Sequence, residues 1–127
     1  MNRYAYNPDQ KKSARVFGRG TRVSQKSSEI VCSRITGMGL DKGKTFLLNM
    51  LMKKESISGK HYTNTANELL NLIKSAESNA EFKGLEPARL VIHASAHKGF
   101  SFYRPRNWKR RLERRKVTNL QVVLEER

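Results

Sequence analysis

The chain has 127 residues, 37% of them hydrophobic, and a formal net charge of +15. This length suits one domain, and a hydrophobic fraction below the usual range of about 45–50% predicts a small core with some chain outside it. The single cysteine, Cys32, excludes an internal disulfide. No apolar stretch approaches the roughly 20 residues that span a bilayer, and residues 1–10 lack the apolar run of a signal peptide. We therefore expect a cytoplasmic protein without a membrane partner.

The positive charge is concentrated in two segments. Residues 1–26 hold seven basic residues against one acidic residue, and residues 98–116 hold nine against one. Residues 27–97 are nearly balanced, with nine basic against seven acidic residues, as is typical of a folded core. A partner with dense negative charge would offset the excess, and nucleic acid is the commonest such partner.

Residues 1–20 are polar, basic and interrupted by proline and glycine. They predict an extended basic N-terminal arm, followed by a single α+β domain over 21–127. Residues 21–23 have the composition of a short strand. Ser24 is then a suitable N-cap for a helix over 25–36, which a pair of glycines ends.

Two further helices are predicted in the centre of the chain. Asp41 is a suitable N-cap for a helix whose apolar stripe reaches Leu51. Residues 65–68 form a capping-box pattern, in which a threonine and a glutamate satisfy backbone amides reciprocally, at the start of the third helix. Apolar residues then recur at helical spacing as far as Ala80, and Gly84 stands where a C′ glycine belongs.

The last third of the chain alternates with a period of two. Residues 90–97 place leucine, isoleucine and alanine on one face, and residues 119–124 repeat this alternation. Two adjacent strands with one connection default to an antiparallel hairpin, here over 90–124. The elements together predict three helices packed on a small three-stranded antiparallel sheet with a long protruding β-hairpin.

The connection between the two strands is basic and aromatic, not turn-like. If the strands continue through residues 98–116 to a tip near Asn107, each arm is roughly 55 Å long at about 3.3 Å per residue. A body of about 100 residues has a radius of gyration of only ~13 Å, so the hairpin should project well past it. Because an isolated ribbon is marginal in water and its like charges repel, we expect its partner to order it.

Arginine and aromatic side chains interleave in this segment, which favours irregular RNA over duplex DNA. The guanidinium group of arginine can bond a phosphate through two N–H groups at once. Aromatic rings stack on unpaired bases, and each such contact contributes about 1–3 kcal/mol to binding. A disordered basic tail and a protein that compacts DNA or RNA are the alternatives. The predicted RNA-binding residues are Arg15, Arg19, Arg22, Lys26, Lys98, Phe102, Tyr103, Arg104, Arg106, Trp108, Lys109, Arg110, Arg111, Arg114, Arg115 and Lys116.

Two other patterns suggest chemistry, and both are weak. Residues 43–45 end like a phosphate-binding loop, but Met38 stands where that loop requires glycine. His93 and His97 share a strand face and suggest metal ligands or the acid–base pair of an RNA-processing enzyme, but no cluster of Asp, Glu or Cys accompanies them in sequence. We therefore expect no catalytic residue, metal, cofactor or small-molecule substrate.

Several short segments, in this order along the chain, resemble the universal large-subunit ribosomal protein twenty-two family. They are residues 21–26 (TRVSQK), 35–38 (ITGM), 74–81 (KSAESNAE) with 84–85 (GL), 104–106 (RPR) and 122–124 (VVL). The similarity covers about residues 14–126. No single segment is specific to the family, whereas their order and spacing are.

The resemblance implies a structural constituent of the large ribosomal subunit that binds large-subunit ribosomal RNA, supports assembly and contacts neighbouring ribosomal proteins. It also implies that the hairpin lines the peptide exit tunnel, with Arg104, Pro105 and Arg106 at a tip near the nascent peptide. The N-terminal arm and residues 81–85 resemble archaeal and eukaryotic members. The long insertion of those members is mostly missing between Lys54 and Asn64, which suggests a compact archaeal form.

Overall fold

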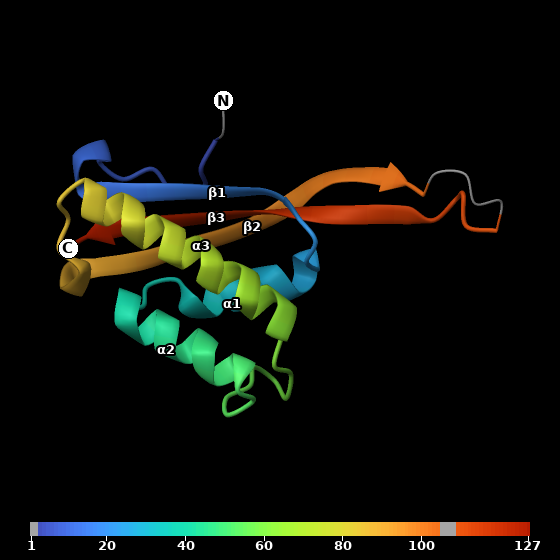
Figure 1. The fold of residues 1–127 in the computed structure, drawn as a ribbon, viewed down its shortest axis with the longest axis horizontal. Helices are drawn as coiled ribbons and strands as arrows, with labels where there is room; N and C mark the ends of the chain where they lie inside the picture. The colour runs from blue at the N-terminus through green and yellow to red at the C-terminus, as the bar shows by residue number, and fades with distance from the viewer. Residues whose placement is uncertain (1–2, 105–108) are drawn as a thin grey trace.

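The computed structural model describes residues 3–104 and 109–127. The elements confirm the predicted α+β class with three helices and a three-stranded antiparallel sheet (Figure 1). The predicted RNA-binding residues Arg106 and Trp108, and the tip residue Pro105, lie outside the described residues. In chain order the elements are the 3-10 helix η1 (Gln10–Lys12), β1 (Ser13–Thr21), α1 (Gln25–Ile35), α2 (Leu40–Leu51), α3 (Thr63–Phe82), the 3-10 helix η2 (Pro87–Arg89), β2 (Leu90–Tyr103) and β3 (Arg114–Glu126).

The sheet has the order β1-β3-β2, so the last strand of the chain is the central one. Ala14, Leu124 and Ile92 stand side by side across the three strands, and all three are buried. Helices α1 and α3 pack on this face, and α2 packs beside α3 (Figure 1). The apolar stripe predicted for the third helix is the core-facing side of α3, where Leu69 and Ile73 are fully buried.

The N-terminal strand differs from the prediction. The strand expected at residues 21–23 is wrong, because β1 lies at Ser13–Thr21, mostly within the segment expected to be an extended arm. Its core-facing positions hold Ala14, Val16 and Gly18, of which only valine favours strands, so the alternation is weak in the sequence. Pairing with β3 along the body, not intrinsic propensity, forms this strand.

The starts of α2 and α3 also differ from the predictions. Gly39 is the N-cap of α2, so the expected cap Asp41 lies in the first turn, where its negative charge suits the helix dipole. Helix α3 begins at Thr63, so the capping box expected at 65–68 is wrong and Thr65 is buried inside the helix. The predicted end is confirmed: Gly84 has a φ of +73°.

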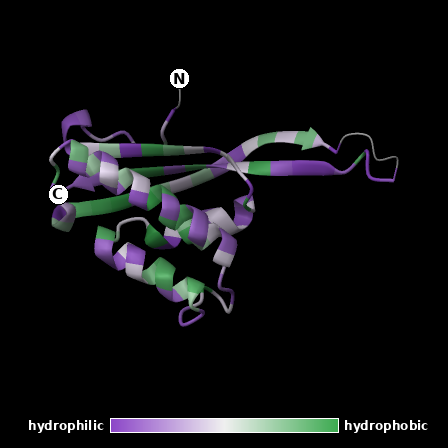
Figure 2. Ribbon diagram, in the orientation of Figure 1, coloured by the Kyte–Doolittle hydropathy of each residue, from purple (hydrophilic) through white to green (hydrophobic). Residues whose placement is uncertain are grey.

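The β2–β3 ladder runs from Leu90 opposite Glu126 to Tyr103 opposite Arg114. Val117 is the last buried residue of β3 on the way to the tip, and beyond it the ribbon extends past the body (Figure 1). Figure 2 shows that the projecting part of β3 is largely hydrophilic, whereas β2 carries alternating hydrophobic bands there. The long projecting hairpin predicted from the sequence is therefore present.

The hairpin leaves the body at a point, here called the hairpin root, where both outer strands bulge against β3. One irregularity lies between Gly18 and Thr21, the other between Lys98 and Ser101, and Thr118 of β3 pairs beside both. Bulges bend strands and increase their twist, so these two bend the sheet locally where the ribbon leaves the body. The backbones of β2 and β3 approach closely here: a Cβ on Gly99 would lie 2.9 Å from the carbonyl oxygen of Val117.

We expect Gly99→Ser to lower the free energy of unfolding by about 1–3 kcal/mol, since the new side chain overpacks the strand pair. Gly39→Ser is the matched control. A Cβ there is 4.0 Å from the nearest atom, and φ is −64° at an N-cap position, where serine is favoured. Urea denaturation of both variants measures the difference. Equal stabilities would show that the root tolerates a side chain.

Candidate nucleic-acid interface

Exposed aromatic side chains line the projecting part of β2. Phe100, Phe102 and Tyr103 are 58%, 41% and 63% exposed, which is unusual for large apolar groups. The rings of Phe100 and Phe102 lie on one face of the strand with centroids 6.2 Å apart, and Tyr103 belongs to the opposite face. Both faces of the ribbon therefore offer a ring on which an unpaired base can stack.

The arginines near the tip gather around one carboxylate. Glu113 lies 3.8, 3.7 and 3.8 Å from the guanidinium groups of Arg104, Arg110 and Arg115. Exposed pairs of this kind contribute about 0–1 kcal/mol each, so Glu113 arranges these arginines without neutralising them. Arg114 donates to Ser101 Oγ at 2.9 Å across the ladder. The remaining predicted hairpin cations Lys109, Arg111 and Lys116 are exposed.

The two basic segments of the sequence meet at the hairpin root. An open hollow of about 590 Å³ is lined by residues 22–26 from the start of α1, by Lys98 of β2 and by residues 114–118 of β3. It therefore brings the predicted residues Arg22 and Lys26 together with Lys98, although more than seventy positions separate them in the chain. Sequence reasoning selected these residues but did not anticipate that they form one concave surface.

Arg15, by contrast, is used within the fold. Its guanidinium donates to the Pro8 carbonyl at 2.7 Å and to Asn7 Oδ1 at 3.4 Å, and it lies over the Tyr4 ring at 5.7 Å from the centroid. The side chain is half-buried by these contacts. Arg19, also predicted from the sequence, stays exposed on β1. Of these two arginines, Arg19 is therefore the one available to a partner.

The N-terminal segment 3–8 lies across the sheet face opposite the helices, which the sequence did not reveal. The side-chain amide of Gln121 binds this segment through both of its polar atoms. Oε1 accepts a hydrogen bond from Ala5 N–H at 2.9 Å, and Nε2 donates one to the Arg3 carbonyl at 2.7 Å. The Tyr6 ring stacks on His93 at 4.1 Å between centroids. The only hint in the sequence is a polar Gln121 within an apolar strand.

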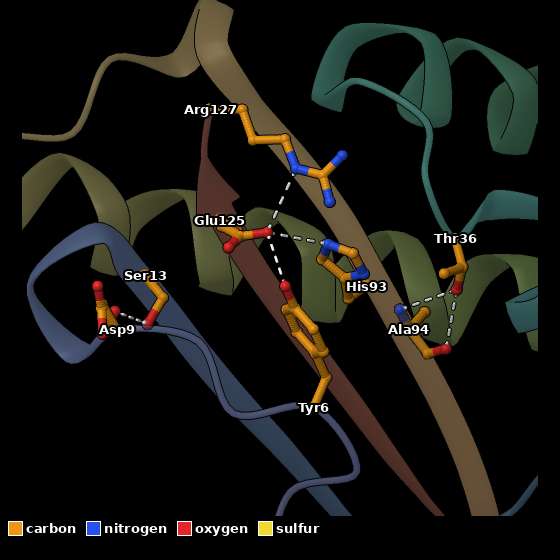
Figure 3. A network of polar contacts seen from close by, with 8 residues as sticks. All are labelled: Tyr6, Asp9, Ser13, Thr36, His93, Ala94, Glu125 and Arg127. Atoms are coloured by element: carbon orange, nitrogen blue, oxygen red, sulfur yellow. Dashed lines mark hydrogen bonds and ion pairs between the residues drawn. The ribbon is translucent and has the colours of Figure 1, made fainter.

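Glu125 fixes the same segment through its carboxylate (Figure 3). Tyr6 donates its hydroxyl to Oε2 at 3.0 Å, while His93 Nε2 and Arg127 Nε lie 3.3 and 3.5 Å from that oxygen. Burial raises the pKa of Glu125, but the Tyr6 hydrogen bond, the Arg127 charge and His93 outweigh it, so the pKa lies below its usual value. The carboxylate is thus the charged anchor of the N-terminal segment.

The two histidines considered as a catalytic pair have separate structural contacts. His93 belongs to the Tyr6–Glu125 cluster, whereas His97 Nε2 lies 3.3 Å from Asn119 Nδ2. Within residues 3–104 and 109–127, no three His, Cys, Asp or Glu side chains are grouped so that they could hold a metal ion. None of the helices in that part of the chain is long and apolar enough to cross a membrane.

The residues that resemble a phosphate-binding loop lie in the middle of α2. Gly43 is buried where a Cβ would overlap the Ile92 side chain, so glycine permits close packing of α2 on β2. Lys44 pairs with Glu77 of α3. The Thr45 hydroxyl donates a hydrogen bond to the Asp41 carbonyl at 2.9 Å. Packing and an ion pair therefore account for this motif.

A small α+β body with basic charge concentrated on a projecting hairpin and at its root is typical of structural proteins that associate with nucleic acid. The family model described as Ribosomal protein L22p/L17e matches residues 16–125. The chain belongs to this ribosomal protein family, as its sequence resemblance implied. It is a structural constituent of the large subunit of the cytoplasmic ribosome and not an enzyme.

Curated archaeal proteins named Large ribosomal subunit protein uL22 are similar over nearly the whole chain. The protein of Methanopyrus kandleri is 33% identical over 94% of this chain and 90% of its own length, and that of Methanococcus aeolicus is 30% identical over 97% and 95%. The protein of Methanococcoides burtonii is 28% identical over 98% and 96%. The first alignment spans 146 positions, more than the 127 residues present here, so that relative has residues that this compact chain lacks.

The Glu125 anchor predicts that the N-terminal segment loosens in acid. The pKa of Glu125 is lower in the folded chain than its usual 4.5. The stabilisation that the charged Glu125 carboxylate gives the N-terminal segment is therefore fully present above pH 4.5, and it is lost as the pH falls through the folded pKa. We expect the Ala5 amide to lose protection as the pH falls below 4.5. Amide exchange by NMR measures it.

Glu125→Gln should remove this pH dependence, since glutamine does not titrate and can still accept the Tyr6 hydroxyl. Glu81→Gln, at an exposed position of α3, is the control and should leave the transition unchanged. An identical acid transition in the Glu125→Gln protein would assign it to another group.

Proposed function

We propose that the chain binds large-subunit ribosomal RNA through its projecting hairpin, supports subunit assembly and contacts neighbouring ribosomal proteins through its body. One observation carries this proposal: a two-stranded ribbon that leaves the core carries nine basic residues against one acidic residue over 98–116, together with exposed aromatic rings. Glu113, the acidic residue that lies beside these cations, belongs to the ribbon itself. Ribosomal RNA supplies both phosphates for the cations and unpaired bases for the rings.

Two physical terms contribute to this binding. Each neutralised phosphate releases counterions, which makes affinity fall with salt by about 0.7 to 0.9 in log–log slope. Each stacked base contributes about 1–3 kcal/mol and depends little on salt. The ribbon separates the two terms spatially, because its projecting cations are concentrated on β3 and the segment before it, whereas Phe102 and Tyr103 are on β2.

We also propose that the hairpin lines the nascent-peptide exit tunnel, with Arg104, Pro105 and Arg106 nearest the nascent peptide. Membership of the family supports this placement. The geometry agrees with it, since Arg104 N–H donates to the Glu113 carbonyl at 3.2 Å and closes the ladder beside the tip. A ribbon closed in this way can pass through RNA with its paired strands and bring only its tip to the nascent peptide.

Two variants distinguish phosphate contacts from stacking on transcribed large-subunit RNA. Replacing Arg110, Arg111, Arg114 and Lys116 with glutamine should lower the magnitude of the salt slope by roughly 3, at about 0.7–0.9 per lost phosphate. Phe102→Ala with Tyr103→Ala should weaken binding by about 1–3 kcal/mol for each ring and leave the slope nearly unchanged. Filter binding across a salt series measures both quantities.

Lys54→Gln with Lys60→Gln is a control on the loop before α3, remote from the ribbon (Figure 1). It should change affinity little. A salt slope that is flat in the wild-type protein, or that responds equally to the loop variant, would contradict binding through the hairpin.

Tunnel lining predicts a contact with the nascent chain. A photocrosslinking residue at position 104 should capture the peptide in ribosomes stalled during translation, whereas the same residue at Lys54 should not. Crosslinks from position 104 to RNA alone would contradict the tunnel placement and leave RNA binding intact.

A further inference from the structure

We propose that the hollow at the hairpin root is part of a second RNA-backbone site, the root groove, which holds the body on the RNA independently of the hairpin tip. The root groove is defined by Arg22, Ser24, Lys26, Lys98, Lys116 and Asn64. This inference rests on the proposed function, because it takes the partner to be ribosomal RNA. It adds a site on the body, including the start of α3, to the hairpin surface.

Two adjoining hollows form the groove. The first, of about 590 Å³, lies between the start of α1 and the hairpin, and the second, of about 300 Å³, lies between the start of α1 and the start of α3. Both are lined by residues 22–24, so they meet at Arg22. Residues 62–65 complete the second hollow. A strand of RNA that follows Arg114 to Lys116 down the ribbon can therefore continue over the body.

The charge of the groove is uncompensated. Aspartate and glutamate are absent from the residues that line either hollow. Among the described residues, the side chains of Arg22, Lys26, Lys98 and Lys116 make no ion pair or side-chain hydrogen bond. Cations elsewhere on the body behave differently: Lys44 pairs with Glu77, and Lys83 donates to the Ser13 carbonyl at 2.8 Å. Some cations are therefore paired within the fold, whereas these four can pair with a ligand.

The helix starts in the groove add charge of the same sign. Neither α1 nor α3 has an acidic residue in its first turn or a side-chain hydrogen bond at its N-cap. Lys26, in the first turn of α1, is placed against the helix dipole at some cost in stability. Sequences break such local rules mainly at functional sites, and a phosphate bound between the cations would satisfy both the dipole and the ammonium group.

The groups around the cations specify the ligand as a phosphodiester backbone. Ser24, Ser27 and Asn64 provide hydroxyl and amide groups that can bond phosphate or ribose oxygens. The Tyr62 ring in the second hollow is half-buried, whereas Phe100, Phe102 and Tyr103, which can stack bases, are exposed on the hairpin. The root groove therefore holds backbone, and the hairpin aromatics hold bases.

The experiment titrates the full-length protein with a six-nucleotide oligouridylate and follows backbone amides by NMR. We expect the amides of residues 25–27 and 63–65 to shift, in addition to those of the ribbon. Arg22→Gln with Lys26→Gln should lower the salt slope by about 1.4, since two single-strand phosphate contacts at about 0.7 each are lost. Lys54→Gln with Lys60→Gln removes the same charge elsewhere and should preserve the slope.

Asn64→Asp separates binding from folding. A carboxylate in the first turn of α3 suits the helix dipole, so the melting temperature should stay or rise. The same charge repels phosphate, so binding of the oligouridylate should weaken. Unchanged oligouridylate binding by the Asn64→Asp protein would overturn the inference.

Shifts confined to residues 98–116, or an equal loss of slope in the loop control, would also overturn the inference and leave the hairpin proposal standing. Absence of shifts in the ribbon as well would count against both.

Discussion

The central strand β3 occupies two environments, and the rest of the molecule depends on this. From Thr118 to Glu125 it lies between β1 and β2, and its Leu120, Val122 and Leu124 form the buried middle row of the core. From Arg114 to Lys116 it pairs with β2 alone and is exposed or half-exposed. Because the strand is continuous, the core fixes the direction in which the hairpin leaves. The bulges beside Gly20 and Gly99 then provide the local bend.

The charges divide along the same boundary. Several cations of the body are matched by partners, as in the Lys44–Glu77 pair and the contacts of Arg15 with the N-terminal segment. On the ribbon, one acidic residue, Glu113, accompanies nine basic residues over 98–116 and contacts Arg104, Arg110 and Arg115. Repulsion is thereby concentrated on the ribbon and at the hairpin root, where a polyanion can relieve it. A small core can tolerate a high net charge when the charge is placed in this way.

The N-terminal segment gives the sheet a second cover. An antiparallel sheet can leave one face in water, yet here Tyr4 and Tyr6 lie over the face opposite the helices. Gln121 and Glu125 of β3 bind that segment, so the central strand organises both faces. The extended basic arm expected from the sequence is, over residues 3–8, a part of the folded body.

Periodicity in the sequence was sufficient for α3, β2 and β3, because each buries one continuous face and local spacing records burial directly. Gly84 could be placed because a left-handed helix end is a local demand. The two basic segments and the projecting ribbon also followed from local counts of charge and strand length. Tertiary structure alone decided β1, the true start of α3, the cover formed by Tyr6 and the convergence of Arg22 with Lys98. Each of these arises from contacts between segments far apart in the chain, such as Ala5 with Gln121, and no local pattern of residues encodes such a contact.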